Sequence, residues 1–299
     1  MQYDCVIVGG GIAGLQAAVQ LGRYRHRVLV IDAGHGRWSL CQGYHNVLGW
    51  PDGVSGQTLR DLGRMQAAEL GVAFAADEVV EATAVGDQFR VLCQSGSLYP
   101  AKTLLFATGI VDRIPILPVV RECLGISVYV CPDCDGYEVT ERRTVVIGAG
   151  KVGANMALTL TYWTDDIVYI NHEMTDLDAD VRAQFNQRSI EIIASPVTRI
   201  DQTNGRIQSV VLQNGRMVRA ERGFVAFGGN TVNSQVARQL GVTLHTNRHI
   251  LVHPRTKMTN VPNVWAAGDV VAHSEQVTVA MGEGAQAAIW IHKRLLGEA

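Results

Sequence analysis

Two cysteines separated by two residues are the side chains of this sequence best suited to redox chemistry. Cys131 and Cys134 enclose Pro132-Asp133, and Asp135 follows directly. A C-x-x-C pair can close a small disulfide ring, and a helix N-terminus or a nearby positive charge stabilises the thiolate that attacks another disulfide. The pair stands just before the second of two glycine-rich nucleotide-binding patterns. The sequence therefore indicates a redox disulfide that exchanges electrons with a nucleotide cofactor.

The same spacing also occurs in zinc sites and in pairs without a chemical role. A structural zinc site needs four nitrogen or sulfur ligands. The remaining cysteines are scattered along the chain, at Cys5, Cys41, Cys93 and Cys123. Three histidines recur every fourth residue, at His245, His249 and His253. The apolar residues 250–252 favour a strand there, on which residues four apart lie about 13 Å from each other. We expect no metal site.

The first glycine pattern lies close to the N-terminus. Gly9-x-Gly11-x-x-Gly14 follows an apolar strand over residues 5–8 and opens a helical stretch, after which a second apolar strand ends at Asp32. Such glycines permit a tight turn, a close approach of the backbone to a pyrophosphate, and packing of helix on strand. The helix N-terminus faces the phosphates, and the acid can accept a hydrogen bond from a ribose hydroxyl.

The second glycine pattern repeats this plan further along the chain. Gly148-x-Gly150-x-x-Gly153 follows a strand over residues 144–147, and a helical stretch and a strand over residues 167–170 come after it. Each copy opens a βαβ unit. The sequence therefore predicts an α/β fold with two Rossmann-like, doubly wound nucleotide-binding domains.

Apolar patterns predict further elements around these two units. We expect strands over residues 87–91, 102–106, 207–212 and 224–227. Pro115 and Pro118 mark a linker into the second domain, and a helix should run over residues 276–296.

Composition narrows the classes of partner. The chain has 299 residues, of which 47% are hydrophobic and 18% charged, with a formal net charge of -2. No block of lysine and arginine gives an electrostatic footprint for nucleic acid or an anionic membrane, so neither is expected as a partner. The uncharged run over residues 5–21 is interrupted by glycines and follows no basic segment, so we expect neither a signal peptide nor a membrane span. We expect a cytoplasmic protein, and in a reducing compartment a C-x-x-C is more often catalytic than structural.

These motifs resemble the low-molecular-weight thioredoxin reductase family over essentially the whole chain. The shared features are Gly9-x-Gly11-x-x-Gly14 with Asp32, Ala107-Thr108-Gly109, Cys131-x-x-Cys134-Asp135-Gly136, the second glycine pattern, and Ala267-Gly268-Asp269. The resemblance implies a discontinuous FAD domain over residues 1–112 and 241–299. A second nucleotide-binding domain that carries the C-x-x-C, residues 113–240, would be inserted into it. It also implies a homodimer.

The resemblance assigns roles to particular residues. Gly268 and Asp269 would contact the ribityl chain and pyrophosphate of FAD, and Gln276 and Val277 would meet the flavin ring. Thr108 and Gly109, with Asn46 in a segment that approaches the flavin, complete the expected cofactor residues. Cys134 would face the flavin, Cys131 would attack the partner disulfide, and Asp135 would protonate the departing thiolate. Pro132-Asp133 replaces the Ala-Thr usual in thioredoxin reductases and resembles a side branch that includes dithiol oxidases of small molecules.

The second nucleotide site departs from the family. NADPH-dependent members carry arginines that clamp the 2′-phosphate. The matching positions here are Asn171, His172, Glu173 and Leu177. Glu173 would repel a 2′-phosphate but could accept from an unphosphorylated ribose. The site could take NADH, weakly bound NADPH, or no pyridine nucleotide, with ferredoxin or a second FAD as the electron source. Gly153, where thioredoxin reductases usually have Ala, is compatible with an FAD-type pattern.

The FAD-type motifs together with the C-x-x-C leave three functions open. The leading hypothesis is an FAD-dependent disulfide oxidoreductase that passes electrons through Cys131 and Cys134 to a thioredoxin-like protein or a low-molecular-weight disulfide. A second is a dithiol oxidase that runs the same path backwards to oxygen. A third is a redox sensor without turnover.

Overall fold

The computed structural model describes residues 2–115, 120–272 and 274–298. The chain forms two compact units. Unit 1 consists of Met1–Ser39, Ser55–Val111 and Thr231–Ala299. Unit 2 consists of Leu40–Val54 and Asp112–Asn230. Pro118 of the expected linker lies outside the described residues.

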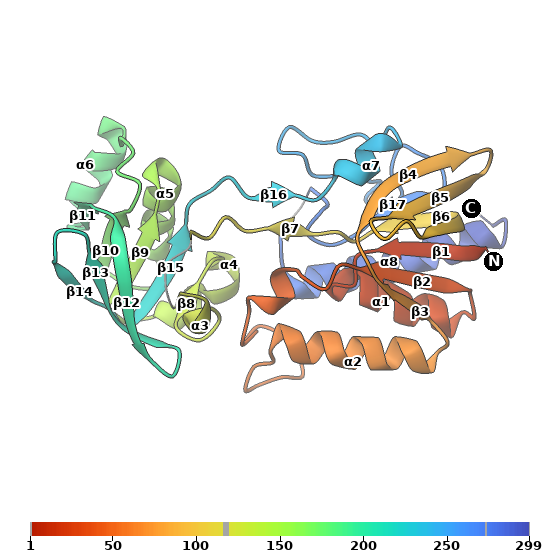
Figure 1. The fold of residues 1–299 in the computed structure, drawn as a ribbon. Coiled ribbons are helices and arrows are strands. Elements are labelled where there is room, and N and C mark those ends of the chain that lie inside the picture. Colours follow the sequence, from red (N-terminus) through yellow and green to blue (C-terminus); the bar gives the residue numbers. More distant parts are fainter. Residues whose placement is uncertain (1, 116–119, 273, 299) are drawn as a thin grey trace. The chain divides into compact units, whose positions relative to one another are not determined.

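Unit 1 is built on a seven-stranded sheet (Figure 1). Its parallel strands are β3 (Ala73–Ala76), β2 (Val28–Asp32), β1 (Tyr3–Val8), β6 (Leu98–Phe106) and β17 (Val264–Ala266). An antiparallel extension pairs the start of β6 with β5 (Gln88–Cys93), and β5 with β4 (Val79–Val85). The continuous burial of β2 and of the second half of β1 is typical of parallel strands that are covered on both faces.

Helices cover the sheet of unit 1. They are α1 (Ile12–Arg23), α2 (Gly56–Glu69), α7 (Gln235–Gln239) and α8 (Val277–Leu295), with a short 3-10 helix over Arg37–Ser39. Small residues let α1 and α8 approach closely, because a Cβ at Gly284 would lie 2.2 Å from the carbonyl oxygen of Ala13. A two-stranded pair, β7 (Ile110–Val111) with β16 (Thr231–Val232), stands where the chain passes between the units.

Unit 2 contains a five-stranded parallel sheet and a three-stranded antiparallel sheet. The parallel sheet has the order β11 (Glu191–Ala194), β10 (Ile167–Asn171), β9 (Thr144–Gly148), β15 (Arg222–Ala226) and β8 (Val128–Tyr129). The antiparallel sheet consists of β12 (Val197–Thr203), β13 (Arg206–Leu212) and β14 (Met217–Arg219). The helices are α3 (Val120–Cys123), α4 (Pro132–Asp135), α5 (Gly150–Leu160) and α6 (Ala179–Gln187), with a 3-10 helix over Gly136–Val139.

The strands and helices expected around both glycine patterns are confirmed as β1, α1, β2 and as β9, α5, β10. The later expected elements are present as β5, β6, β13, β15 and α8, with ends that differ by a few residues. The fold is the expected α/β arrangement. In the described residues, no helix is long and apolar enough to cross a membrane.

The expected domain bounds stay a prediction, and the compact units depart from them at the loop Leu40–Val54, at Asp112 and over residues 231–240. The loop Leu40–Val54 belongs to unit 2, because Leu40 packs against the core of that unit and the Gln42 amide donates to the carbonyls of Arg121 and Glu122. The segment 231–240 belongs to unit 1, because β16 pairs with β7 and the Gln239 side chain hydrogen-bonds to the backbone of β4.

Candidate functional site

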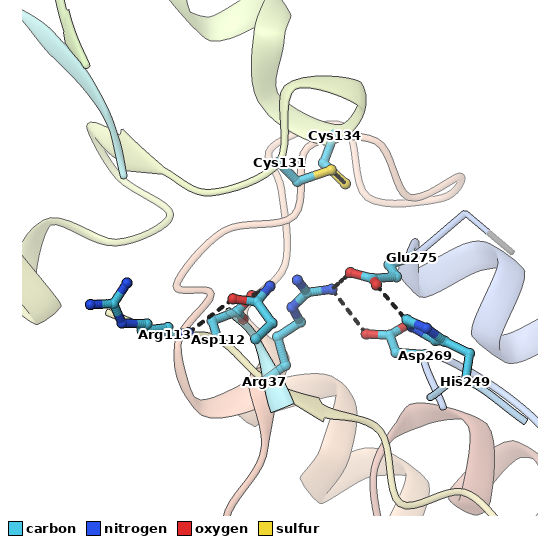
Figure 2. Close-up of polar contacts among 9 residues, drawn as sticks. Arg37, Asp112, Arg113, Cys131, Cys134, His249, Asp269 and Glu275 are labelled. Atoms are coloured by element: carbon cyan, nitrogen blue, oxygen red, sulfur yellow. Dashed lines mark hydrogen bonds and ion pairs between the residues drawn. The ribbon is translucent and has the colours of Figure 1, made fainter. Parts of the chain in front are cut away.

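The redox pair lies at the start of α4 in unit 2. Cys131 has extended backbone and precedes the helix, and Pro132 occupies the first helical position, where its missing N–H costs nothing. The N–H groups of Cys134 and Asp135 donate to the Cys131 carbonyl, at 3.3 and 3.0 Å. This turn brings the two sulfur atoms to 2.7 Å from each other (Figure 2). The two thiols are therefore placed to form a disulfide with each other when they are oxidised.

Asp135 is a half-buried carboxyl one residue beyond the pair. Burial raises the pKa of Asp135 to about 7, and the negative charge of Glu138 adds to the effect. A carboxyl with this pKa holds a proton for a large part of the time at neutral pH. Asp135 is thus able to serve as an acid where an ordinary aspartate could not.

The first glycine pattern forms a cradle at the N-terminus of α1. Gly9 has φ +108°, and a Cβ on it would lie 2.3 Å from the carbonyl oxygen of Ala107. A Cβ on Gly14 would lie 2.0 Å from the carbonyl oxygen of Gly9, which explains the helix packing. A Cβ on Gly11 would meet nothing within 4 Å, and no side chain caps the helix there. This open, uncapped helix N-terminus fits the pyrophosphate of a dinucleotide.

Asp32 ends β2 beside this cradle and is buried. Its Oδ1 accepts from the Gly34 N–H, and its Oδ2 accepts from Nη2 of Arg60 at 2.6 Å. Arg60 in turn stacks on Trp38, with 4.3 Å between the guanidinium carbon and the ring centroid. Sequence reasoning missed Arg60, which stands 28 residues away on a helix without a motif. A ribose hydroxyl at Asp32 would share the carboxylate with this arginine.

Thr108 and Gly109 are held by one asparagine. The Thr108 hydroxyl donates to the Asn233 carbonyl at 2.6 Å, and the Asn233 amide donates back to the Thr108 carbonyl at 2.9 Å. The N–H of Asn233 donates to the carbonyl of Gly109, which has φ +63°. These bonds fix the turn after β6.

Gly268 and Asp269 follow β17 and are positioned by a buried carboxylate on α8. The Gly268 N–H donates to Oε2 of Glu283 at 3.0 Å, and Nζ of Lys257 lies 2.7 Å from Oε1 of the same residue. Gly268 has φ +77°, and a Cβ on it would lie 2.7 Å from Cβ of Ala13. Only glycine therefore fits this turn, which carries Asp269 next to the start of α1.

A cluster of charges surrounds Asp269 (Figure 2). Arg37 donates through Nη1 to Asp269 at 3.1 Å and to Glu275 at 2.9 Å. Nε2 of the buried His249 lies 3.4 Å from the other oxygen of Glu275. Sequence reasoning did not find Arg37, because 232 residues separate it from Asp269.

Three expected cofactor residues remain to be placed. Gln276 is the extended residue that precedes α8, and Val277 is the first, buried residue of that helix. Asn46 is exposed and lies in the loop Leu40–Val54 of unit 2.

Residues of β15 and β10 pack closely against the second glycine pattern. A Cβ on Gly148 would lie 2.3 Å from the carbonyl oxygen of Ala226, and one on Gly153 would lie 2.6 Å from the ring of Tyr169. The Tyr169 hydroxyl donates to the Gly150 carbonyl at 2.8 Å. The bulk of Tyr169 thus accounts for the third glycine without reference to the kind of nucleotide bound.

The end of β10 carries polar groups that are already engaged. Oδ1 of Asn171 accepts from the Gly150 N–H at 3.0 Å, and Nδ1 of His172 accepts from the Val197 N–H at 2.9 Å. Leu177 is buried in the core. Glu173 forms an ion pair with Arg113, which also stacks near Phe227. In the described residues, none of the four positions that match the arginine clamp presents a cation.

Arg113 also connects this site to the chain that enters unit 2. Its N–H donates to Oδ1 of Asn230 at 3.0 Å, and the Asn230 amide donates to Asp112 at 3.1 Å (Figure 2). Among the described residues, no group of three or more His, Cys, Asp or Glu side chains is arranged to hold a metal ion.

Comparisons with known proteins identify the family. A family model described as pyridine nucleotide-disulphide oxidoreductase matches residues 3–284. The chain is 28% identical over 304 residues to a thioredoxin reductase of Rickettsia bellii (strain RML369-C), with 97% of each protein covered. The crystal structure of HlmI superimposes with a TM-score of 0.88 at 30% identity, and covers 99% of this chain and 93% of that one. A putative thioredoxin reductase TrxB from Bacillus anthracis gives a TM-score of 0.85 at 25% identity, with 99% of each chain covered. The chain therefore belongs to the pyridine nucleotide-disulphide oxidoreductase family and is a thioredoxin reductase-like, FAD-dependent oxidoreductase.

Proposed function

We propose that this enzyme reduces disulfides through Cys131 and Cys134, with a thioredoxin-like protein or a low-molecular-weight disulfide as the acceptor. The observation that carries the proposal is the pair of sulfurs 2.7 Å apart, followed directly by a carboxyl whose pKa is raised to about 7. A nucleophile, a resolving thiol and an acid thus stand within five consecutive residues.

The steps balance as a two-electron exchange. The Cys131 thiolate attacks one sulfur of the acceptor R–S–S–R, forms a Cys131–S–S–R bond and breaks the acceptor bond. The departing thiolate takes a proton from Asp135. The Cys134 thiolate then attacks Cys131, which forms the internal disulfide and releases the second thiolate. FAD held by unit 1 would supply the electron pair that returns this disulfide to the two thiolates.

The residues that would hold FAD are those of unit 1. Gly9, Gly11 and Gly14 would receive the pyrophosphate, and Asp32 the adenosine ribose. The fixed turns at Thr108 and Gly109 and at Gly268 and Asp269 would hold the ribityl side, with Gln276 and Val277 at the ring. Asn46 belongs to unit 2, and its role stays a prediction from the resemblance to the family.

Replacing Cys134 with Ser tests the mechanism. The variant should keep its flavin but lose disulfide reduction, because the mixed disulfide on Cys131 cannot be resolved. The measurement is turnover with an alkyl disulfide, together with the visible flavin spectrum. Full turnover by Cys134→Ser would show that the two cysteines are not the redox pair. Cys123→Ser, which changes a cysteine buried in the core of unit 2, is the matched control.

For the second nucleotide site we infer a preference for NADH over NADPH. Glu173 carries a negative charge where a 2′-phosphate would have to bind, and Leu177 is buried rather than presenting a cation. A ribose diol can replace Arg113 as the partner of Glu173, whereas a phosphate would be repelled.

An anaerobic titration with NADH and with NADPH tests this preference. Stoichiometric bleaching of the flavin band by NADH at lower concentration than by NADPH is the expected result. Equal or better reduction by NADPH contradicts it. Bleaching by a dithiol but by neither nucleotide would favour the dithiol oxidase, and two flavins released per chain would place a second FAD in the site. The homodimer and the cytoplasmic location stay predictions.

A further inference from the structure

The loop Leu40–Val54 is closed by its own backbone hydrogen bonds and packs against the rest of unit 2. Tyr44 and Val54 exchange two backbone hydrogen bonds of 2.8 and 3.1 Å, which makes a hairpin-like loop. At its base the backbone approaches Gly125 so closely that a Cβ there would lie 2.5 Å from the nitrogen of Gln42. The loop is therefore fixed to the unit that carries the redox pair.

His45 is held within this loop between two glycines. A Cβ on Gly43 would lie 3.0 Å from Cε1 of the ring, and a Cβ on Gly53 would lie 2.8 Å from Cδ2. Larger residues at either position would displace the imidazole. In this position, Nδ1 of His45 lies 3.8 Å from Oε1 of Glu138.

Glu138 connects His45 with the proposed acid through its charge. It lies in the 3-10 helix Gly136–Val139, three residues after Asp135, and its charge acts on that carboxyl. Gly136 fixes the start of this turn, because a Cβ on it would lie 2.5 Å from the Trp163 ring. His45, Glu138 and Asp135 thus form a chain of titratable groups beside the cysteines.

We propose that His45 and Glu138 are positioning residues that set the protonation of Asp135 during thiol–disulfide exchange. The proposal rests on the proposed role of Asp135 as the acid of that exchange. An ionised Glu138 keeps the proton on Asp135. The imidazole of His45, with Nδ1 3.8 Å from Oε1 of Glu138, holds this carboxylate and weakens its effect on Asp135.

Among the described residues, Tyr129, Arg222 and the two thiols of Cys131 and Cys134 also lie close to this chain. Tyr129 on β8 is buried, which raises its pKa well above the ordinary value, so it stays neutral. Arg222 on β15 donates through Nε to the backbone carbonyl of Glu138 at 3.0 Å and keeps its charge. Because both reactions compared below use the same two thiols, Glu138 and His45 are the groups whose replacement should move the titration of Asp135 in their ratio.

The experiment compares two disulfides in single-turnover reactions. Enzyme is reduced anaerobically with dithiothreitol, desalted, and mixed with bis(hydroxyethyl) disulfide or with dithiobis(nitrobenzoate) over a series of pH values. Both reactions need the Cys131 thiolate, but only the alkyl thiolate leaves poorly enough to need a proton from an acid. The ratio of the two rates therefore isolates the titration of Asp135. It should fall with rising pH around the pKa of that residue.

Replacing Glu138 with Gln should shift this fall to lower pH by on the order of one unit, because a nearby negative charge is lost. Replacing His45 with Gln should shift it to higher pH by a smaller amount. In the Glu138→Gln background, His45→Gln should have no further effect, because its partner charge is gone. Asp52→Asn, which changes an exposed acid of the same loop, is the control. It should leave unchanged the pH at which the ratio of the two rates falls.

Two results separate the possible failures. If Asp135→Asn leaves the ratio as dependent on pH as in the unmodified enzyme, Asp135 is not the acid and the proposed function loses its proton donor. If Asp135→Asn removes the dependence but Glu138→Gln does not shift it, the positioning role is wrong while the acid remains. An equal shift from His45→Gln with and without Glu138 likewise overturns the role of His45. Circular dichroism checks that each variant is folded.

Discussion

The proton affinity of Asp135 is set by the residues packed around it. Burial deprives the ionised carboxylate of hydration and so disfavours it, and Glu138 adds a like charge. Together they raise the pKa of Asp135 from the ordinary 3.8 to about 7. The same shift that makes the residue an acid must cost stability at high pH.

The sign of this cost follows from proton binding. Between about pH 4 and 7 the folded protein keeps a proton on Asp135 that the unfolded chain has lost, so the free energy of unfolding falls as pH rises through this window. Asn at this position carries no such cost. The stability gap between Asp135→Asn and the unmodified protein should therefore grow by about 1–2 kcal/mol between about pH 5 and pH 8, after allowance for solvent screening.

Urea unfolding at several pH values measures this gap. Asp176→Asn, at an exposed acid of the same unit, should give a gap that does not change with pH. A constant gap for Asp135→Asn would mean that its carboxyl is not held protonated by the fold.

At the scale of elements, the packing of α5 on β10 depends on one aromatic ring. Tyr169 is fully buried, and its hydroxyl is bonded to the first turn of α5. The ring fills the space that a methyl group on Gly153 would need. The third glycine of the second pattern is thus a packing requirement of this helix and strand.

Replacing Gly153 with Ala should destabilise unit 2 by about 1–3 kcal/mol, because the buried ring cannot move aside. Gly282→Ala on α8, where a Cβ meets nothing within 4 Å, is the matched control and should be neutral or stabilise by up to about 1 kcal/mol. Thermal unfolding measures both. Adding Tyr169→Leu should recover much of the loss in Gly153→Ala. Absence of this recovery would count against the packing argument.

Much of the secondary structure was predictable from sequence. The strands β1, β2, β9 and β10 are uninterrupted apolar runs beside glycine patterns, which is the signature of buried parallel strands. The helix α2 gave no comparable signal, because only Gly56 and Ala67 along its length are buried. Its role in placing Arg60 on Asp32 therefore depended on tertiary structure.

The residues of the candidate site likewise divide into those that the sequence reveals and those that only the tertiary structure reveals. Cysteine and glycine spacings within a few residues are visible in sequence because the chemistry itself requires them. Arg37 and Glu283 are single charged residues without a motif, and their partners are chosen by how distant segments pack. The shift at Asp135 depends on burial, which no local pattern encodes.

At the scale of the whole molecule, the loop Leu40–Val54 joins unit 2 although the residues on both sides of it belong to unit 1. Leu40 packs against the core of unit 2, whereas Leu48 in the same loop is 98% exposed. These two leucines allow the attachment of the loop to be tested apart from the loop itself.

Replacing Leu40 with Ala should destabilise unit 2 by about 1–2 kcal/mol, less than a fully buried leucine because the side chain is only partly buried. Hydrogen exchange should become faster around α3 and β8 and stay unchanged in β1 and β2 of unit 1. Leu48→Ala should change neither. Equal protection of α3 and β8 in the two variants would show that Leu40 does not anchor the loop.

The position of β17 and α8 has a consequence for how the enzyme is made. A ribosome releases the Gly9 to Gly14 cradle first, but β17 pairs with β6, and α8 packs on α1 and supplies Glu283 to Gly268. The five strands of the unit 2 parallel sheet emerge before these segments. Unit 2 can therefore fold on the nascent chain while unit 1 still lacks β16, α7, β17 and α8. The flavin is then loaded late, and a chain interrupted after residue 230 would carry its redox cysteines on a folded unit with no finished place for their electron source.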